Sequence, residues 1–118
     1  MQEDDYLEWA IHIRECLDST FVGVLATAEK GGAWATPIYF IYDEKFNLYF
    51  MSDSKTRHII DIEKAANVSV AVFMPTADSQ GFKVGIQLEG VAIKVPDQDI
   101  EEVYMRRSMR LTGSKTWN

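Results

Sequence analysis

The hydrophobic positions at the start of the chain follow a helical spacing. Tyr6, Ala10, Ile13 and Leu17 recur every three or four residues, so residues 3–17 are predicted to form an amphipathic helix that covers one side of a core. The pattern then becomes rich in β-forming residues, interrupted by turn-forming residues. Three strands are expected here, at residues 20–28, 33–42 and 48–52, with turns at 29–32 and 43–47. Because the connections are short, the three strands should form an antiparallel meander.

The second half of the chain continues with a helix, two strands and a last helix. The first of these helices is predicted over residues 55–65, with Asp53 or Ser54 as its N-cap. The remaining elements are strands at 68–74 and 82–95, a polar loop between them at 75–81, and a helix from 96 to about 110.

The order of these elements predicts the fold class. It lacks the regular strand and helix alternation of a parallel sheet. Gly85 and Gly90 mark places where the long last strand is expected to bend or bulge, which helps a sheet to close. We therefore expect a mainly β, α+β fold, a small antiparallel barrel with flanking helices, formed as one domain by residues 1–118.

Charge and composition exclude several classes of function. A formal net charge of -6 argues against general affinity for nucleic acid or anionic membranes. No apolar run approaches the roughly 20 residues that span a bilayer, and the N-terminus is acidic, so a cytoplasmic protein is expected. The single cysteine, Cys16, has no second cysteine for a disulfide or a thiolate metal site. His12 lies four residues before Cys16, but two such ligands make a weak metal site.

The most informative stretch is residues 47–58, where a strand runs directly into the start of a helix. The junction carries Ser54, Lys55, Thr56, Arg57 and His58. A helix start has unpaired backbone N–H groups and a partial positive charge, and cations placed there work against that dipole unless an external anion is bound. The sequence therefore predicts an anion site, with phosphate as a suitable ligand. Taken alone, His58 could contact the anion, act as an acid or base, or pack in the core.

Six short segments carry a resemblance to a known family. They are VLAT at 24–27, ATPIYF at 35–40, YDEK at 42–45, LYFMS at 48–52, KTRH at 55–58 and NVSVAV at 67–72. In this order they cover most of residues 20–95. The chain thereby resembles the pyridoxamine 5'-phosphate oxidase-like FMN-binding split barrels.

The resemblance implies a homodimer that holds FMN in clefts between its subunits, with the flavin as the redox group acting on a small molecule. It places the phosphate at Lys55, Thr56 and Arg57, and it adds His58 to the cofactor site. It also implies that backbone atoms of two segments line the flavin ring. These are Thr36, Pro37, Ile38 and Tyr39 in the first segment, and Met51 and Ser52 in the second.

Two departures from the family pattern limit what the resemblance implies. The oxidases themselves carry a C-terminal segment with basic residues that bind the substrate, and the sequence from Leu111 to Asn118 is expected to provide no counterpart. Specific oxidation of pyridoxamine phosphate is therefore not expected. Asp53 also lies beside the predicted phosphate site, where a carboxylate repels the ligand unless it points away as a helix cap.

Alternative functions remain open at this point. Within the same fold, the chain could bind FMN, haem or a deazaflavin as a carrier or sensor without turnover. An oligonucleotide-binding barrel is compatible with the aromatic strands, although the acidic charge argues against it.

Overall fold

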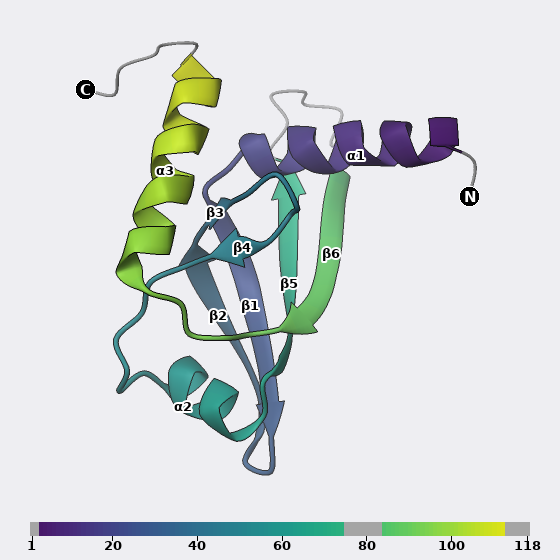
Figure 1. Cartoon of the computed structure of the whole chain (residues 1–118). Coiled ribbons are helices and arrows are strands. Elements are labelled where there is room, and N and C mark those ends of the chain that lie inside the picture. The colour runs from purple at the N-terminus through teal and green to yellow at the C-terminus, as the bar shows by residue number, and fades with distance from the viewer. Residues whose placement is uncertain (1–2, 75–83, 113–118) are drawn as a thin grey trace.

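The computed structural model describes residues 3–74 and 84–112, and it has the α+β, antiparallel character predicted from the sequence (Figure 1). In chain order the elements are α1 (Glu3–Asp18), β1 (Val22–Glu29), β2 (Gly32–Tyr39), β3 (Ile41–Tyr42), β4 (Leu48–Tyr49), α2 (Arg57–Lys64), β5 (Asn67–Met74), β6 (Val84–Val91) and α3 (Asp97–Thr112). The three predicted helices are all present.

Four strands form one antiparallel sheet in the order β2-β1-β5-β6. Side chains alternate across it, so that Leu25 and Thr27 of β1 are buried while Val24 is exposed. The inner face contributes to a core that also contains the last turn of α1. The buried core side chains are Cys16, Leu17, Leu25, Ile38, Phe40, Tyr42 and Val72.

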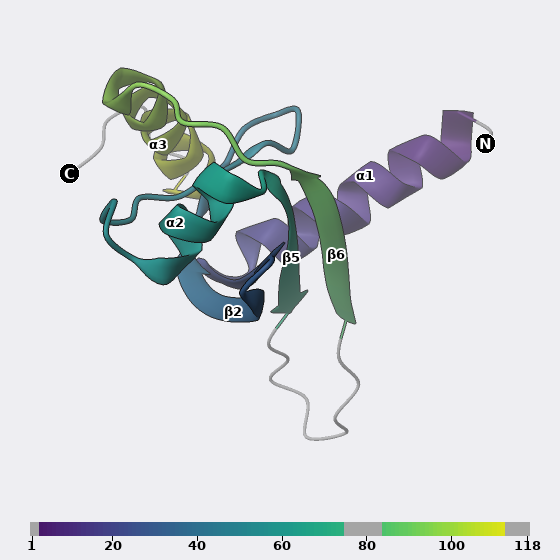
Figure 2. The same cartoon turned by 90° about the horizontal axis from the view of Figure 1, so that it is seen from below.

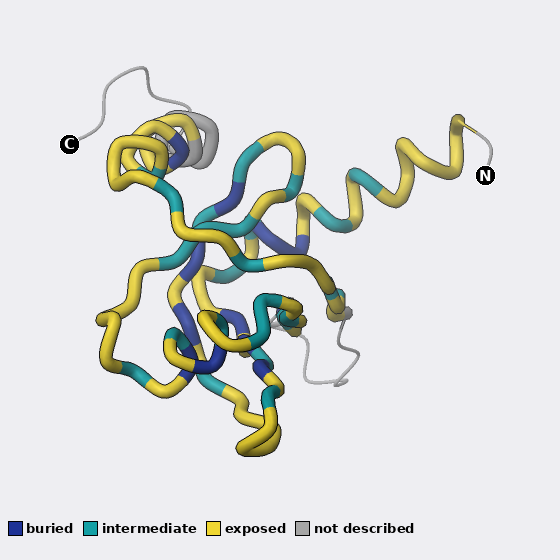
Figure 3. The backbone as a smooth tube through the Cα atoms, turned by 60° about the horizontal axis from the view of Figure 1, so that its bottom comes forward, coloured by how far each residue is buried: buried dark blue, intermediate teal, exposed yellow. Residues whose placement is uncertain are grey.

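The helices surround this sheet unevenly. α1 lies across one end of the sheet, and its first half projects beyond the strands (Figure 2). Only Cys16 and Leu17 of this helix are buried, whereas Trp9 is 62% exposed. Most of the helix is therefore exposed, as the burial colouring in Figure 3 shows. α2 packs against β1 and β2 at the far end of the sheet, and α3 packs against β3. None of the helices described is long and apolar enough to cross a membrane.

The predicted three-stranded meander is wrong in one respect. The expected strand at 33–42 is divided at Phe40, and β3 pairs with β4 in a separate two-stranded sheet. Phe40 and Tyr42 are 2% and 1% exposed, so their side chains fix this segment in the core and draw the chain away from β2. The strand expected at 48–52 accordingly ends at Tyr49.

The last two strands also differ from the prediction. β6 ends at Val91 instead of residue 95, whereas residues 82–83 and the loop at 75–81 lie outside the described residues. The β5–β6 register runs one to one without a bulge, from Asn67 opposite Val91 to Met74 opposite Val84. A Cβ added at Gly85 would lie 3.1 Å from Phe73 Cβ, so this glycine permits close approach of the strands rather than a bulge.

Candidate functional site

The junction before α2 is held by Asp53. Its Oδ1 accepts a hydrogen bond from the Lys55 N–H at 2.8 Å, and its backbone carbonyl accepts from both the N–H and the hydroxyl of Thr56. Because these bonds form a turn at residues 53–56, the helix begins at Arg57 and not at the predicted residue 55. The predicted N-cap, Asp53 or Ser54, is therefore wrong, because Thr56 occupies that position.

The side chain of Thr56 does not cap the start of α2. Its backbone is extended, with φ -71° and ψ 152°, and its side chain makes no capping hydrogen bond to the helix. Its hydroxyl proton goes to the Asp53 carbonyl instead. The N–H groups of the first helical turn thus lack the side-chain acceptor that an N-cap normally supplies. The carboxylate of Asp53 accepts a hydrogen bond from the Lys55 N–H, which precedes the N-cap and is not part of the first helical turn.

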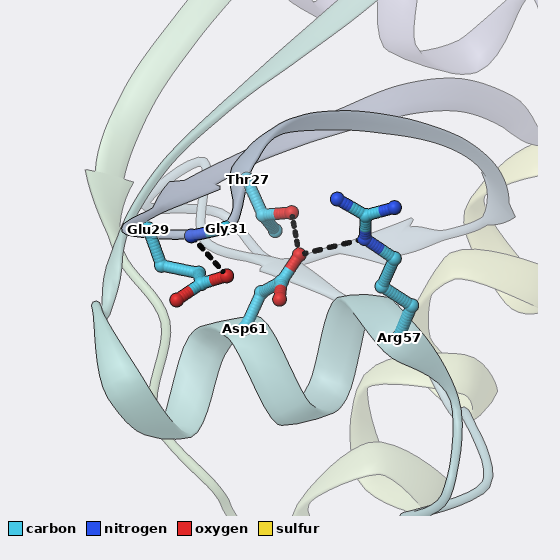
Figure 4. Close-up of polar contacts among 5 residues, drawn as sticks. All are labelled: Thr27, Glu29, Gly31, Arg57 and Asp61. Carbon is cyan, nitrogen blue, oxygen red and sulfur yellow. Dashed lines mark hydrogen bonds and ion pairs between the residues drawn. The ribbon is translucent and has the colours of Figure 1, made fainter.

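Arg57 is held from two sides. Its Nε lies 3.7 Å from Oδ2 of Asp61, one helical turn further along α2. Its Cζ lies 4.3 Å from the centroid of the Trp34 ring, which is a cation–π contact. The Arg57 side chain is nevertheless 45% exposed. Figure 4 shows Nε directed toward Asp61 and the two terminal nitrogens directed away from it.

Asp61 joins this arginine to the sheet. It is 3% exposed, and its Oδ2 accepts a hydrogen bond at 3.0 Å from the hydroxyl of Thr27, which is 2% exposed on β1 (Figure 4). The sequence reasoning missed Thr27, Trp34 and Asp61. The four-residue spacing of Arg57 and Asp61 was a usable signal for an ion pair on one helix face. The pairing of Thr27 with Trp34 follows from the register of the β1–β2 hairpin.

His58 points inward. It is 8% exposed, and its Nε2 lies 2.7 Å from Ser52 Oγ and 3.4 Å from Thr56 Oγ1. The Phe50 ring lies beside it, with the ring centroids 6.2 Å apart. Three predicted site residues, Ser52, Thr56 and His58, thus lie together. His58 connects the segment before the turn to the start of α2.

The predicted residues of β2 divide between two faces. Ile38 is buried and Thr36 is half-buried on the inner face, whereas Pro37 and Tyr39 are exposed on the outer face. β2 is an edge strand of its sheet. The Phe40 N–H donates to the Phe21 carbonyl, so by antiparallel alternation the backbone groups of Thr36 and Ile38 face β1.

Pro37 and Tyr39 therefore present their backbone groups to the free edge of the sheet. Proline is compatible with this position because the N–H that it lacks would point away from the ladder. Tyr39 is 80% exposed, and Met51 beyond β4 is 72% exposed. The residues expected to line a flavin ring thus include two large side chains that this chain leaves exposed.

The candidate metal ligands on α1 do not converge. Cys16 is buried, and its Sγ lies 3.7 Å from the Val72 carbonyl. Burial raises the pKa of its thiol, which disfavours the metal-binding thiolate. His12 Nε2 instead lies 3.9 Å from Glu8 Oε1. Within residues 3–74 and 84–112, no three histidine, cysteine or acidic side chains are grouped as a metal site requires.

Comparison with known families and structures identifies relatives of this arrangement. The sequence profile of the pyridoxamine 5'-phosphate oxidase family matches residues 10–115. A comparison with curated proteins finds no match.

Several solved structures are similar to the chain, and three of them are compared with it below. A heme-binding protein from Mycobacterium smegmatis has a TM-score of 0.71 and 19% identity, covering 92% of this chain and 47% of its own. An FAD-binding protein from Mesorhizobium loti has a TM-score of 0.69 and 20% identity, covering 92% and 80%. HutZ, the heme storage protein from Vibrio cholerae, has a TM-score of 0.63 and 17% identity, covering 87% and 78%.

At these identities the likeness shows the fold. The split-barrel fold class predicted from the sequence is confirmed, although the sheet described here is not closed. The chain spans about half the length of the Mycobacterium smegmatis protein.

Proposed function

The chain belongs to the pyridoxamine 5'-phosphate oxidase family, and from this premise we propose that it is an FMN-binding oxidoreductase that acts on a small molecule. The flavin supplies hydride or electron transfer at its own ring. The protein's part is to hold the cofactor, to exclude water from it and to select what reaches it. In this proposal no side chain has to act as a nucleophile.

The observation that carries the proposal is the exposed cation pair at the uncapped start of α2. Lys55 and Arg57 are both exposed there, and Arg57 keeps its terminal nitrogens directed away from Asp61. A phosphate monoester has close to two negative charges near neutral pH. Arg57 can meet it with two parallel N–H bonds, Lys55 adds a mobile charge, and the first-turn N–H groups of α2 can donate as well. These groups fit the phosphate of FMN.

The contacts of the other proposed site residues limit what each can contribute in this proposal. The Thr56 hydroxyl donates to the Asp53 carbonyl, so Thr56 can contribute its position at the start of α2 but not that proton. His58 lies inward against Ser52, and its role in the proposal is to fix this segment next to the phosphate. The carboxylate of Asp53 accepts from the Lys55 N–H and does not cap the helix, so in this proposal the positive charges of Lys55 and Arg57 have to outweigh its repulsion of the phosphate.

The proposed ring site lies at the free edge of β2, near Pro37 and Tyr39, with Met51 and Ser52 from the segment after β4. We propose that a second copy of the chain covers it, because a flavin beside side chains as exposed as Tyr39 and Met51 would otherwise face water. The outer sheet face offers large exposed apolar side chains to such a homodimer, beside the exposed polar side chains of Gln87 and Glu89 on β6. The apolar ones are Val22, Val24, Tyr39, Phe73 and Val91.

Haem is the second candidate, because two of the similar structures bind or store it. A haem iron needs an axial ligand, and the chain has two histidines. His58 is buried with its Nε2 bonded to Ser52, and His12 lies on the exposed side of α1 near Glu8. Neither histidine is placed well to bind a haem iron, whereas Lys55 and Arg57 are placed well to bind a phosphate.

One experiment separates these possibilities. The purified protein is incubated with FMN or with haem, passed through gel filtration, and examined by absorption spectroscopy. We expect flavin absorption to elute with the protein after FMN incubation. Calorimetry should then give a lower Kd for FMN than for riboflavin, and NADH or NADPH should bleach the bound flavin if the protein turns over. A protein that stays colourless after FMN incubation contradicts the proposal.

A further inference from the structure

Thr27 is buried, but it belongs neither to the apolar core nor to the residues proposed to bind the cofactor. It lies on the inner face of β1, opposite Trp34 in the hairpin register. Its hydroxyl donates to Asp61 Oδ2 at 3.0 Å, and both side chains are almost fully buried. A hydrogen bond from a threonine hydroxyl to a buried carboxylate is strong and directional, because the acceptor is charged and water is excluded.

The same carboxylate oxygen faces Arg57. The Arg57 Nε lies 3.7 Å from Asp61 Oδ2, which is longer than a hydrogen bond. The two donors thus meet one acceptor atom, and Thr27 is the closer of the two (Figure 4). Arg57 is left as a loose partner of Asp61, and its guanidinium rests on the Trp34 ring.

We propose that Thr27 is a positioning residue that keeps Arg57 available to an external phosphate. By donating to Oδ2, Thr27 satisfies the buried carboxylate and prevents Asp61 from drawing the guanidinium into a close ion pair. Asp61 is then a competitor of the ligand for Arg57, and Thr27 weakens that competitor. This inference rests on the proposed function, since it concerns how strongly the site prefers a phosphate-bearing flavin.

The physical reason lies in the cost of leaving a buried charge without a donor. If the Thr27 hydroxyl is removed, the carboxylate of Asp61 needs a replacement, and Arg57 Nε is the donor already facing the same oxygen. Arg57 would move toward Asp61, and a close ion pair would satisfy part of its charge within the protein. The phosphate would lose part of its attraction to Arg57, whereas the ring site on β2 would remain unchanged.

The test compares Thr27→Val with Thr27→Ser, using calorimetry with FMN and with riboflavin. Valine keeps the shape of threonine without the hydroxyl, and serine keeps the hydroxyl. We expect Thr27→Val to weaken FMN by about three- to tenfold and riboflavin hardly at all, whereas Thr27→Ser keeps most of the preference for FMN. In an Arg57→Ala background, Thr27→Val should cause no further loss of FMN affinity, because its effect passes through Arg57.

Asp61→Asn provides an independent test with the opposite sign, which also serves if Thr27→Val does not fold. Asparagine can still accept from Thr27 but no longer attracts Arg57 as a charge. We expect the preference for FMN over riboflavin to rise by about twofold or more. An unchanged or lower preference would mean that Asp61 does not compete for Arg57, and it overturns the inference.

The failure of this inference can be distinguished from failure of the proposed function. If the wild-type protein binds FMN no better than riboflavin, the phosphate site itself is wrong, and the role of Thr27 falls with it. If the wild-type protein prefers FMN and Thr27→Val keeps the same preference, the phosphate site stands and only the role of Thr27 is refuted.

Discussion

The guanidinium of Arg57 lies over the Trp34 ring, with its Cζ 4.3 Å from the ring centroid. The two residues come from distant parts of the chain, the first turn of α2 and the β1–β2 hairpin. An indole face attracts a cation, and it also limits the directions in which a long side chain can point. The hairpin therefore helps to determine where the cation of the proposed phosphate site is held.

The first prediction tests this contact. Trp34→Leu should weaken FMN binding by about two- to fivefold, because an exposed cation–π contact contributes about 0.5 to 1 kcal/mol. Trp34→Phe should lose less, since it keeps an aromatic face. Calorimetry with FMN and riboflavin provides the measurement. Equal losses for the two ligands would indicate that Trp34 supports the fold or the flavin ring, and not the phosphate.

The second prediction concerns Arg57 itself. A charge-assisted bond to phosphate contributes about 1.5 to 3 kcal/mol, so Arg57→Ala should weaken FMN by roughly ten- to a hundredfold and riboflavin hardly at all. Lys64→Ala is the matched control, because it removes a cation from the last turn of the same helix. If Lys64→Ala weakens FMN as much as Arg57→Ala does, the effect reflects general charge and not a phosphate site at the helix start.

The sequence indicated where a candidate site lies, but it did not predict the contacts that the structure shows within it. Residues 54–58 could be predicted as a candidate anion site because helix-start geometry and residue charge are local properties. The N-cap could not be assigned correctly, since Asp53 can bond either to a helix N–H or to the turn before it. In the structure it bonds to the Lys55 N–H and so builds that turn.

Contacts between distant segments were beyond the sequence patterns. The division of residues 33–42 at Phe40 results from burial of Phe40 and Tyr42, which alternation along the strand does not reveal. The burial of Asp61 against Thr27 requires α2 to pack on β1, and no local pattern specifies that docking. The hydrophobic pattern predicted the order of the elements along the chain but not these pairs.

The third prediction concerns pH and the loop between β3 and β4. Burial alone would raise the pKa of the Asp43 carboxyl, but hydrogen bonds from Asn47, Tyr49 and Lys45 outweigh it and hold the pKa below its ordinary value. A carboxyl with a lowered pKa in the folded state stabilises the protein above its unfolded pKa of about 4, and this stabilisation is lost as the pH falls through the folded pKa.

Asp43→Asn should therefore lower the free energy of unfolding by about 1 to 3 kcal/mol at neutral pH, because the charged acceptor of these bonds is removed. The difference from the wild-type protein should shrink below pH of about 4. Urea denaturation at a series of pH values measures both quantities, with Glu44→Gln, at the next residue of the same turn, as the control. A difference that stays constant through this range would show that the charge of Asp43 is not the source.

The fourth prediction tests the proposed homodimer. Val24 is 43% exposed in the middle of the outer sheet face, opposite Pro37 on β2 and Ala71 on β5. A lysine there would place a charge within the apolar surface that we propose the second copy covers, and burying an unpaired charge is strongly unfavourable. Val24→Lys should raise the dimer dissociation constant at least about tenfold, as measured by sedimentation, and should reduce FMN retention with it. Glu44→Lys adds the same side chain to an exposed turn and should leave both properties unchanged.

If Val24→Lys stays dimeric and still retains FMN, the outer face is not the interface. If it becomes monomeric and still retains FMN, the cofactor site is complete within one copy, because Lys55, Arg57 and the free edge of β2 all belong to the same chain.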